Sequence, residues 1–258
     1  MSLTQTDRGS MELNTRVDNI EFGTNILDIK VPTWLRNKFK VGIQYWDDAL
    51  GGGGFTPSAV TLFTGEPGAG KTTAMLALAD AITKNGGLAL FNTAEESLHQ
   101  VSMVVERLRL KKGFIAGQEN NVPKLLEQCD KLIAKNPGKQ FFLIIDSLQC
   151  MDDGYYKDGG INSRTAVRVL QMVTDWCKKT KSVGICIGQV NKTGRMAGSN
   201  KLKHMVDSML HLRVEQRDPD LAGLRVLETV KNRFGGCGYN FYLDLKPRGF
   251  EFVARVAL

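Results

Sequence analysis

One short stretch limits more than any other what this chain can fold into. The apolar run at residues 60–64 leads directly into the glycine-rich sequence GEPGAGKTT, and a helical pattern follows from Lys71 to about Lys84. A strand, a glycine-rich turn and a helix in this order form the first half of a βαβ unit, in which the helix covers a parallel strand. The stretch therefore predicts an α/β protein with a parallel sheet.

The glycine-rich turn has the residue types that a bound phosphate group requires. It matches the pattern GxxxxGK[ST] at Gly65, Gly70, Lys71 and Thr72. Glycines let backbone N–H groups curl around a phosphate, and the start of the helix adds its partial positive charge. We expect Lys71 to reach the β- and γ-phosphates of a nucleotide and Thr72 to bind Mg²⁺. The predicted nucleotide contacts are Gly65, Glu66, Pro67, Gly68, Ala69, Gly70, Lys71, Thr72 and Thr73.

The rest of the chain continues the alternation of strand and helix patterns. Strands are expected at 60–64, Leu88–Thr93, Phe141–Asp146 and 183–190, and helices at 71–84, 96–110, 123–134 and 164–179. Three more strand-like runs then follow one another, at Ser208–Val214, 224–230 and 239–245. This order predicts a mostly parallel central sheet with helices on both faces and an antiparallel C-terminal extension. Residues 1–40 are polar and irregular and are expected to form an N-terminal arm or extension, with the core at 41–258.

Polar side chains follow three of the predicted strands at the points where those strands end. Asp146 ends a continuous apolar run, and beside a phosphate loop we predict that it binds Mg²⁺, directly or through water. Glu95 and Glu96 follow another strand, and we predict that Glu95 polarises the attacking water. The alternative is that both glutamates only enrich the first turn of the next helix. Gln189 is predicted to sense the γ-phosphate; the alternative is an ordinary polar residue at a strand end.

Composition and charge exclude some classes of protein. The chain is 42% apolar and 24% charged, as in an ordinary globular protein, and no apolar run approaches the roughly 18 residues of a transmembrane helix. The first thirty residues contain no apolar signal core, so we expect a cytoplasmic location and no membrane partner. Five cysteines form no CxxC pair, which excludes a zinc site of the usual spacing. The net charge of +7 weakly favours a polyanionic partner.

Several motifs together carry a family resemblance. Four stand in a fixed order, GEPGAGKTT, TAEES, LIIDS and GQVNK, and three further stretches are FKVGIQYWDDALGGGGF, LKHMVDSML and VKNRFG. They resemble the RecA-like ATPase core, and within it the ATPase domain of bacterial RadA (Sms), over about residues 39–252. The four-cysteine zinc module and the protease-like domain of RadA have no counterpart in this sequence. A minimal phage-type RadA/RecA-like protein is therefore the other expectation.

The resemblance implies an ATPase that uses ATP and Mg²⁺ and assembles as a ring or a filament. In such assemblies the nucleotide lies between subunits. The resemblance implies that Lys231 and Arg233, in VKNRFG, act on the γ-phosphate held by the neighbouring subunit. An inserted arginine can be worth about 10³–10⁵ in rate. Gly235 and Gly236 are expected to let this turn approach the interface. The alternative is a solvated basic strand end. With Lys71, Glu95 and Gln189, these cations complete the predicted catalytic set.

The resemblance also implies single-stranded DNA as a partner, bound by two loops, at about 150–163 and 191–204. The second loop is basic and has no acid, and it can follow a phosphate backbone. In the first loop two tyrosines can stack on bases, although three aspartates oppose DNA. The predicted DNA contacts are Lys192, Arg195, Lys201, Lys203, Tyr155 and Tyr156.

Three functions are compatible with these features. The first is a DNA-binding motor or recombinase of the RadA/RecA type, acting in DNA recombination or repair. The second is a regulatory ATPase assembly of the KaiC type, which acts on a protein partner. The third is an interaction module in which the N-terminal arm docks a partner and ATP is a switch. The basic second loop and VKNRFG favour the first function.

Overall fold

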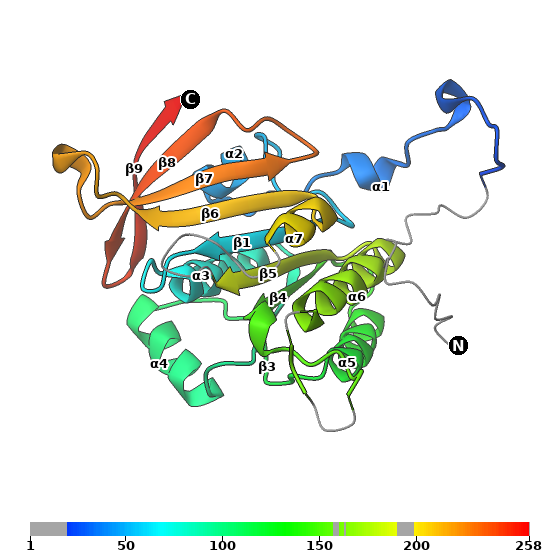
Figure 1. The fold of residues 1–258 in the computed structure, drawn as a ribbon, viewed down its shortest axis with the longest axis horizontal. Helices are drawn as coiled ribbons and strands as arrows, with labels where there is room; N and C mark the ends of the chain where they lie inside the picture. Colours follow the sequence, from blue (N-terminus) through cyan, green and yellow to red (C-terminus); the bar gives the residue numbers. More distant parts are fainter. Residues whose placement is uncertain (1–19, 157–159, 163, 190–198, 258) are drawn as a thin grey trace.

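One sheet organises the protein. The computed structural model describes residues 20–156, 160–162, 164–189 and 199–257, and in these residues nine strands form a sheet in the order β3-β2-β4-β5-β1-β6-β7-β8-β9 (Figure 1). The strands are β1 Val60–Gly65, β2 Leu88–Thr93, β3 Ile115–Gly117, β4 Phe141–Asp146, β5 Val183–Gln189, β6 Ser208–Val214, β7 Arg225–Asn232, β8 Tyr239–Lys246 and β9 Gly249–Ala257. The strands from β3 to β6 in this order pair in parallel, and β7, β8 and β9 are antiparallel. The predicted fold class is therefore confirmed.

Helices cover both faces of the sheet. They are α1 Thr33–Arg36, α2 Gln44–Ala49, α3 Lys71–Lys84, α4 Leu98–Leu108, α5 Val122–Lys135, α6 Thr165–Thr180 and α7 Ser199–Met205. Side chains of α2, α3 and α4 pack in one apolar cluster, and those of α5, α6 and α7 pack in a second cluster on the other face. Among the described residues, no helix has both the length and the apolar character needed to cross a membrane.

Strand β4 shows why the central strands read as continuous apolar runs. All six of its residues are buried. Phe142 and Ile144 point into the cluster beneath α3, while Phe141, Leu143 and Ile145 point into the cluster beneath α6. Successive side chains of a strand alternate between faces, so a strand covered on both faces needs apolar residues throughout. Only its last residue, an aspartate, faces the edge where the parallel strands end.

Several elements were absent from the sequence-based prediction: the short α1, α2, α7 and β3, and the nine-residue β9. Strand β3 has only three residues, which is too short for an alternating pattern to be recognised. Helix α7 occupies residues predicted as the second half of a mobile loop, and this prediction was wrong. Leu202 and Met205 lie three residues apart, on one face of the helix, and are buried in the cluster with α6. Packing, rather than local propensity, makes this short segment helical.

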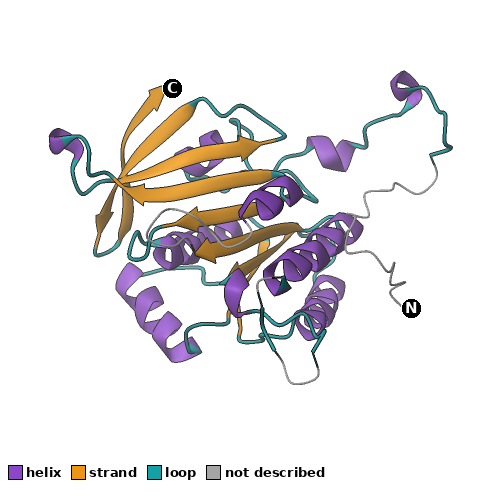
Figure 2. Cartoon of the chain, in the orientation of Figure 1, coloured by secondary structure: helices purple, strands orange, loops and turns teal. Residues whose placement is uncertain are grey.

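Residues 20–36, before the core, extend away from the body of the molecule (Figure 2). Several of their apolar side chains are exposed: Phe22 completely, and Leu27 to 88%. Closer to the core, the Trp34 ring lies 5.0 Å from the ammonium of Lys181, and the Phe39 ring packs edge-on against Phe142. The division of the chain at residue 40 into an arm and a core stays a prediction.

Candidate active site

The shape of the phosphate loop depends on glycine at two positions. A Cβ atom at Gly65 would come within 2.4 Å of the carbonyl oxygen of Leu212 on the neighbouring strand β6. Gly70 has a φ of +98°, in the left-handed region that favours glycine, and a Cβ there would meet the Phe250 ring at 2.9 Å. Close packing therefore leaves no room for a side chain at either of these positions. The nucleotide contacts predicted from the sequence run from the last residue of β1 through this loop into the first turn of α3.

Lys71 and Thr72 begin helix α3 and face the inside of the loop. The Lys71 ammonium donates to the carbonyl oxygens of Gly65 (3.0 Å) and Glu66 (2.9 Å). Burial lowers the pKa of Lys71, and the nearby carboxylates of Asp146, Glu95 and Glu66 oppose this effect. The Thr72 hydroxyl donates to Asp146 Oδ2 at 2.7 Å. The fold thus joins the phosphate loop directly to the predicted metal-binding carboxylate.

The residues present fit a Mg²⁺ ion. Asp146 is buried, and its pKa is raised to about 6. Burial is the largest cause and the charges of Glu95 and Glu96 act in the same direction, while the Thr72 hydrogen bond and the charge of Lys71 act in the opposite direction. This carboxylate therefore lies among other negative groups, where a cation would stabilise it. Hydroxyl and carboxylate oxygens are ligands that Mg²⁺ prefers. Thr72 and Asp146 would hold the ion beside the loop.

The raised pKa of Asp146 leads to a prediction for the ligand-free protein. Because this pKa is raised from 3.8 to about 6, ionising Asp146 lowers the free energy of unfolding by up to about 3 kcal/mol. This loss of stability develops as pH rises from about 4 to 6. We expect Asp146→Asn to raise the free energy of unfolding at pH 7 and to have little effect near pH 4. Urea unfolding across this pH range measures the difference. A variant that is less stable than the wild type at pH 7 would contradict the expectation.

Glu95 lies where three segments meet. One carboxylate oxygen, Oε1, accepts a hydrogen bond from the Ser147 hydroxyl after β4 and another, at 2.6 Å, from the Gln189 amide at the end of β5. Glu95 follows β2, and the strands β4 and β5 of its two partners lie next in the sheet, between β2 and β1. The Glu95 side chain therefore extends along the carboxyl edge of the sheet, toward the phosphate loop. Its exposure leaves it accessible to water. A carboxylate held by two donors in this way can be oriented toward a water molecule.

The alternative interpretation of the two glutamates was wrong. Helix α4 begins at Leu98, with Ser97 as its N-cap in a capping box with Gln100, so neither glutamate lies in its first turn. Instead, the backbone N–H and C=O of Glu96 both bond to the Thr93 hydroxyl. This local turn fixes the backbone just after β2, and the side chain of Glu95 extends to Ser147 and Gln189.

Two positioning side chains were not predicted from the sequence. Ser147, described above, is one. The other is Gln149, whose side-chain amide accepts from the backbone N–H of Gln189 (3.2 Å) and donates to its carbonyl oxygen (3.3 Å). It thereby holds the end of β5 as a neighbouring strand would. The stretch DSLQ at the end of β4 carries both residues, but only the pairing of β4 with β2 and with β5 reveals their partners.

Lys231 and Arg233 lie at the opposite edge of the sheet from the phosphate loop. Asn232, between them, pairs with Ser208, and Ser208 pairs with Thr61 near the start of β1. The phosphate loop begins at Gly65, at the other end of β1. Gly65 lies four residues after Thr61, which is about 13 Å at ~3.3 Å per residue. This separation exceeds the reach of either side chain, so neither cation can contact the phosphate loop of its own chain.

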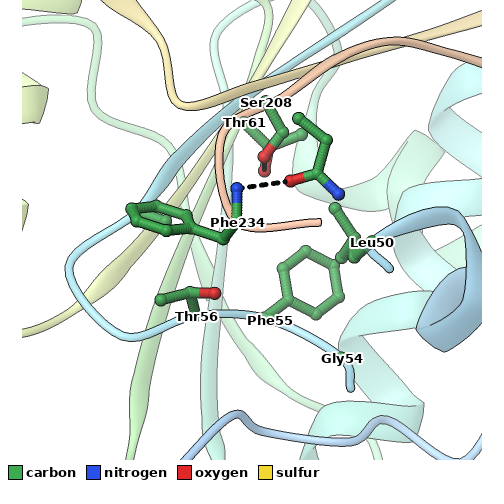
Figure 3. Close-up of a pocket in the computed structure, with 9 residues that line it drawn as sticks. Leu50, Gly54, Phe55, Thr56, Thr61, Ser208 and Phe234 are labelled. Carbon is green, nitrogen blue, oxygen red and sulfur yellow. Dashed lines mark hydrogen bonds between the residues drawn. The ribbon is translucent and has the colours of Figure 1, made fainter. Parts of the chain in front are cut away.

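The turn after Lys231 is packed against the segments on both sides of α2. The Lys38 ammonium donates to the carbonyl oxygen of Phe234 at 2.8 Å. A small pocket lies beneath the Phe234 ring, and the Phe234 N–H donates to the side-chain oxygen of Asn232 (Figure 3). Gly235 approaches Gly51 so closely that a Cβ on either residue would lie 2.8 Å from the Cα of the other. Gly235 therefore has a packing role within its own chain.

The close approach of Gly51 and Gly235 leads to a stability prediction. We expect Gly235→Ala to lower the free energy of unfolding by about 1–3 kcal/mol, because the new methyl group overlaps Gly51 and Asn232. Gly236→Ala is the matched control, since a Cβ there meets nothing within 4 Å, and its effect should stay within about 0.5 kcal/mol. Urea unfolding of both variants measures the difference. Equal stability of the two variants would contradict the packing role.

The predicted DNA-binding residues fall into three groups. Lys192 and Arg195 lie outside the residues that the structure describes. Lys201 and Lys203 are exposed on helix α7 instead of a loop. Tyr155 and Tyr156 are exposed, with ring centroids 4.9 Å apart.

Two of the three aspartates near these tyrosines are engaged in local contacts, and the third, Asp158, lies outside the residues that the structure describes. Asp153 forms an ion pair with Arg168, whose guanidinium lies 4.7 Å from the Tyr155 ring centroid. Asp152 accepts from the side chain of Asn121 and from the backbone N–H of Gly154. The charge of Asp153 therefore opposes a polyanion less than the sequence suggested.

The strand order, the phosphate loop and the carboxylates at the ends of β2 and β4 define the class of the fold, which is that of the RecA-like P-loop ATPases. The structure matches a solved ATPase domain with a TM-score of 0.73, over 83% of this chain and 91% of that one, at 14% sequence identity. No family model matches the chain.

Among curated proteins, this chain is similar to bacterial DNA repair proteins named RadA. It is 28% identical to RadA of Aquifex aeolicus over 94% of this chain and 54% of the relative. It is 33% identical to RadA of Mycobacterium tuberculosis (75% of this chain, 39% of the relative) and 31% identical to RadA of Streptococcus pneumoniae (84% and 49%). The chain therefore spans about half the length of these relatives. The resemblance inferred from the motifs is confirmed.

Proposed function

We propose that this chain hydrolyses ATP with Mg²⁺ at the interface between copies of itself, and that it couples hydrolysis to single-stranded DNA in recombination or repair. One observation carries the proposal: the sheet presents two incomplete halves of a phosphoryl-transfer site on opposite edges. The carboxyl edge has the phosphate loop, Asp146 and Glu95, and the amino edge has Lys231 and Arg233. The similarity to DNA repair proteins named RadA supports the same function.

At the carboxyl edge, each group has a distinct task. The backbone N–H groups of the loop bind the phosphates, and Lys71 exchanges its carbonyl partners for the β- and γ-phosphates. Mg²⁺, held by Thr72 and Asp146, offsets the negative charge of the phosphates when it is bound. Glu95 accepts a proton from the attacking water, and Gln189 reports the γ-phosphate to the segment that follows β5.

The cations at the amino edge act on a neighbouring copy. Because Lys231 and Arg233 cannot reach the phosphate loop of their own chain, the phosphate that they stabilise is held by the next subunit. Such a head-to-tail contact uses different surfaces on the two partners, so it generates a ring or a filament. Hydrolysis then depends on assembly, because each site is complete only when a neighbour inserts its cations.

Exposed cations and aromatic rings support single-stranded DNA as the partner. Helix α7 presents Lys201 and Lys203, and the two tyrosines offer flat surfaces for bases. The proposed contacts are Lys192, Arg195, Lys201, Lys203, Tyr155 and Tyr156. A cytoplasmic location is part of the same proposal.

The experiment that tests this function measures ATP hydrolysis with and without oligo-dT. We expect DNA to stimulate turnover. Replacing Lys201 and Lys203 by alanine should weaken binding of labelled oligo-dT and reduce the slope of log affinity against log salt by about 0.7 per lost phosphate contact. Lys179→Ala, at an exposed lysine on α6, is the control and should keep the wild-type slope. Turnover that is indifferent to DNA would reject the proposal in favour of a regulatory assembly with a protein partner.

A further inference from the structure

The C-terminal end of helix α7 binds both cations of the amino edge. The Lys231 ammonium donates to the carbonyl oxygens of Lys203 (2.8 Å), His204 (3.4 Å) and Val206 (2.7 Å). Arg233 Nη2 donates to the same His204 oxygen at 3.2 Å. The last carbonyls of a helix lack partners within the helix and carry partial negative charge. Two side chains from β7 and the turn after it therefore cap this helix end.

Asp207 follows the helix and links these cations to the central sheet. Its side chain is buried; Oδ2 accepts from the backbone N–H of Val60 (3.0 Å) and Oδ1 faces Arg233 Nη1 at 3.4 Å. Its backbone carbonyl accepts from the Arg233 N–H (2.9 Å), and its own N–H donates to the Val60 carbonyl (3.0 Å). Asp207 thus bonds to the first residue of β1 and to both the main chain and the guanidinium of Arg233.

The charges explain why a carboxylate is needed at this position. Burial lowers the pKa of Lys231, the neighbouring positive charge of Arg233 lowers it further, and Asp207 acts in the opposite direction. Two like charges held close together repel each other, and the attraction of a carboxylate beside them offsets that repulsion. The Arg233 side chain is 47% exposed, so it remains accessible to a second ligand while Asp207 holds its inner side.

We infer that Asp207 is a positioning residue for hydrolysis, which holds Arg233 and Lys231 together in the geometry that the neighbouring subunit's γ-phosphate requires. This inference rests on the proposed function, in which both cations act on a neighbouring copy. Two of the carbonyls that bind Lys231, those of Lys203 and His204, belong to helix α7, which also carries the proposed DNA contact Lys203.

The test uses Asp207→Asn, which keeps an oxygen for the Val60 N–H but removes the negative charge beside Arg233. We expect kcat of DNA-stimulated hydrolysis to fall by about 10²-fold, the loss that a misplaced catalytic group can cause. KM for ATP and the urea midpoint of unfolding should stay close to the wild type. A purely structural role would lower the unfolding midpoint and leave kcat of the folded fraction unchanged, and that result would overturn the inference.

Mixing variants separates this inference from the function on which it rests. In an equal mixture of the two variants, the Asp207→Asn chain supplies an intact Glu95 and the Glu95→Gln chain supplies intact cations. About a quarter of the interfaces (a half times a half) combine these two intact parts. Turnover should therefore recover to about a quarter of the wild-type rate. The control mixture pairs Arg233→Ala with Glu95→Gln. Recovery in the control but not with Asp207→Asn would overturn the positioning role alone. Failure of the control mixture would reject action between subunits, and the inference with it.

Discussion

Replacing Arg233 by alanine is expected to lower DNA-stimulated ATP turnover by about 10³-fold or more, the magnitude typical of an inserted arginine. The physical reason is that the guanidinium offsets charge that develops on the γ-phosphate in the transition state. ATP binding should be retained, since the phosphate loop that binds the nucleotide lies at the other edge of the sheet. Steady-state kinetics at saturating DNA, with ATP binding measured by fluorescence titration, separates the two effects.

A matched control shows whether the effect comes from Arg233 itself or from the loss of one positive charge. Arg217 is exposed on the segment after β6, and Arg217→Ala should leave kcat within a few-fold of the wild type. Sedimentation of both variants with ATP and DNA checks that they still assemble. If Arg233→Ala assembles and hydrolyses ATP at the wild-type rate, the amino edge does not contribute to the chemistry.

The second large effect concerns Glu95. We expect Glu95→Gln to lower kcat by about 10²–10⁴-fold, because an amide cannot accept the proton of the attacking water. The amide oxygen can still accept from Ser147 and Gln189, so the variant should keep the fold and bind ATP. Single-turnover hydrolysis with radiolabelled ATP measures the chemical step directly.

The adjacent glutamate provides the control for this prediction. Glu96→Gln changes the same charge one residue away, while the backbone contacts of Glu96 with Thr93 are preserved. Its kcat should stay within a few-fold of the wild type. A larger loss in Glu96→Gln than in Glu95→Gln would exchange the roles of the two residues.

Local sequence patterns were sufficient for the parallel half of the fold. Strands covered on both faces are continuous apolar runs, and β2, β4 and α3 have the predicted bounds. Helices α4, α5 and α6 are amphipathic over three or more turns. Where an element is short or stabilised by distant partners, as α7 and β3 are, these patterns fail. Helix α7 has only seven residues, and its end is capped by Lys231 from a strand that follows much later in the chain.

In the candidate site, too, local patterns predicted some features and missed those that depend on distant contacts. The phosphate loop, Asp146 and Glu95 were predicted from residue types that follow strands, because parallel strands bring their carboxyl ends to one edge. The clamp of Gln149 on Gln189 was not predicted, because it depends on β4 and β5 being neighbours. The packing of Gly51 against Gly235 was missed for a similar reason, since these residues lie far apart in the sequence.

The sequence by itself therefore determined the class of the fold, the phosphate loop and the residue types available for chemistry, since each depends on short-range spacing. Only the tertiary structure decided that Lys231 and Arg233 lie at the opposite edge from their own phosphate loop, and that Asp207 and the end of α7 hold them there. Strand order and antiparallel register fix these positions, and both result from contacts between distant segments that local periodicity does not encode.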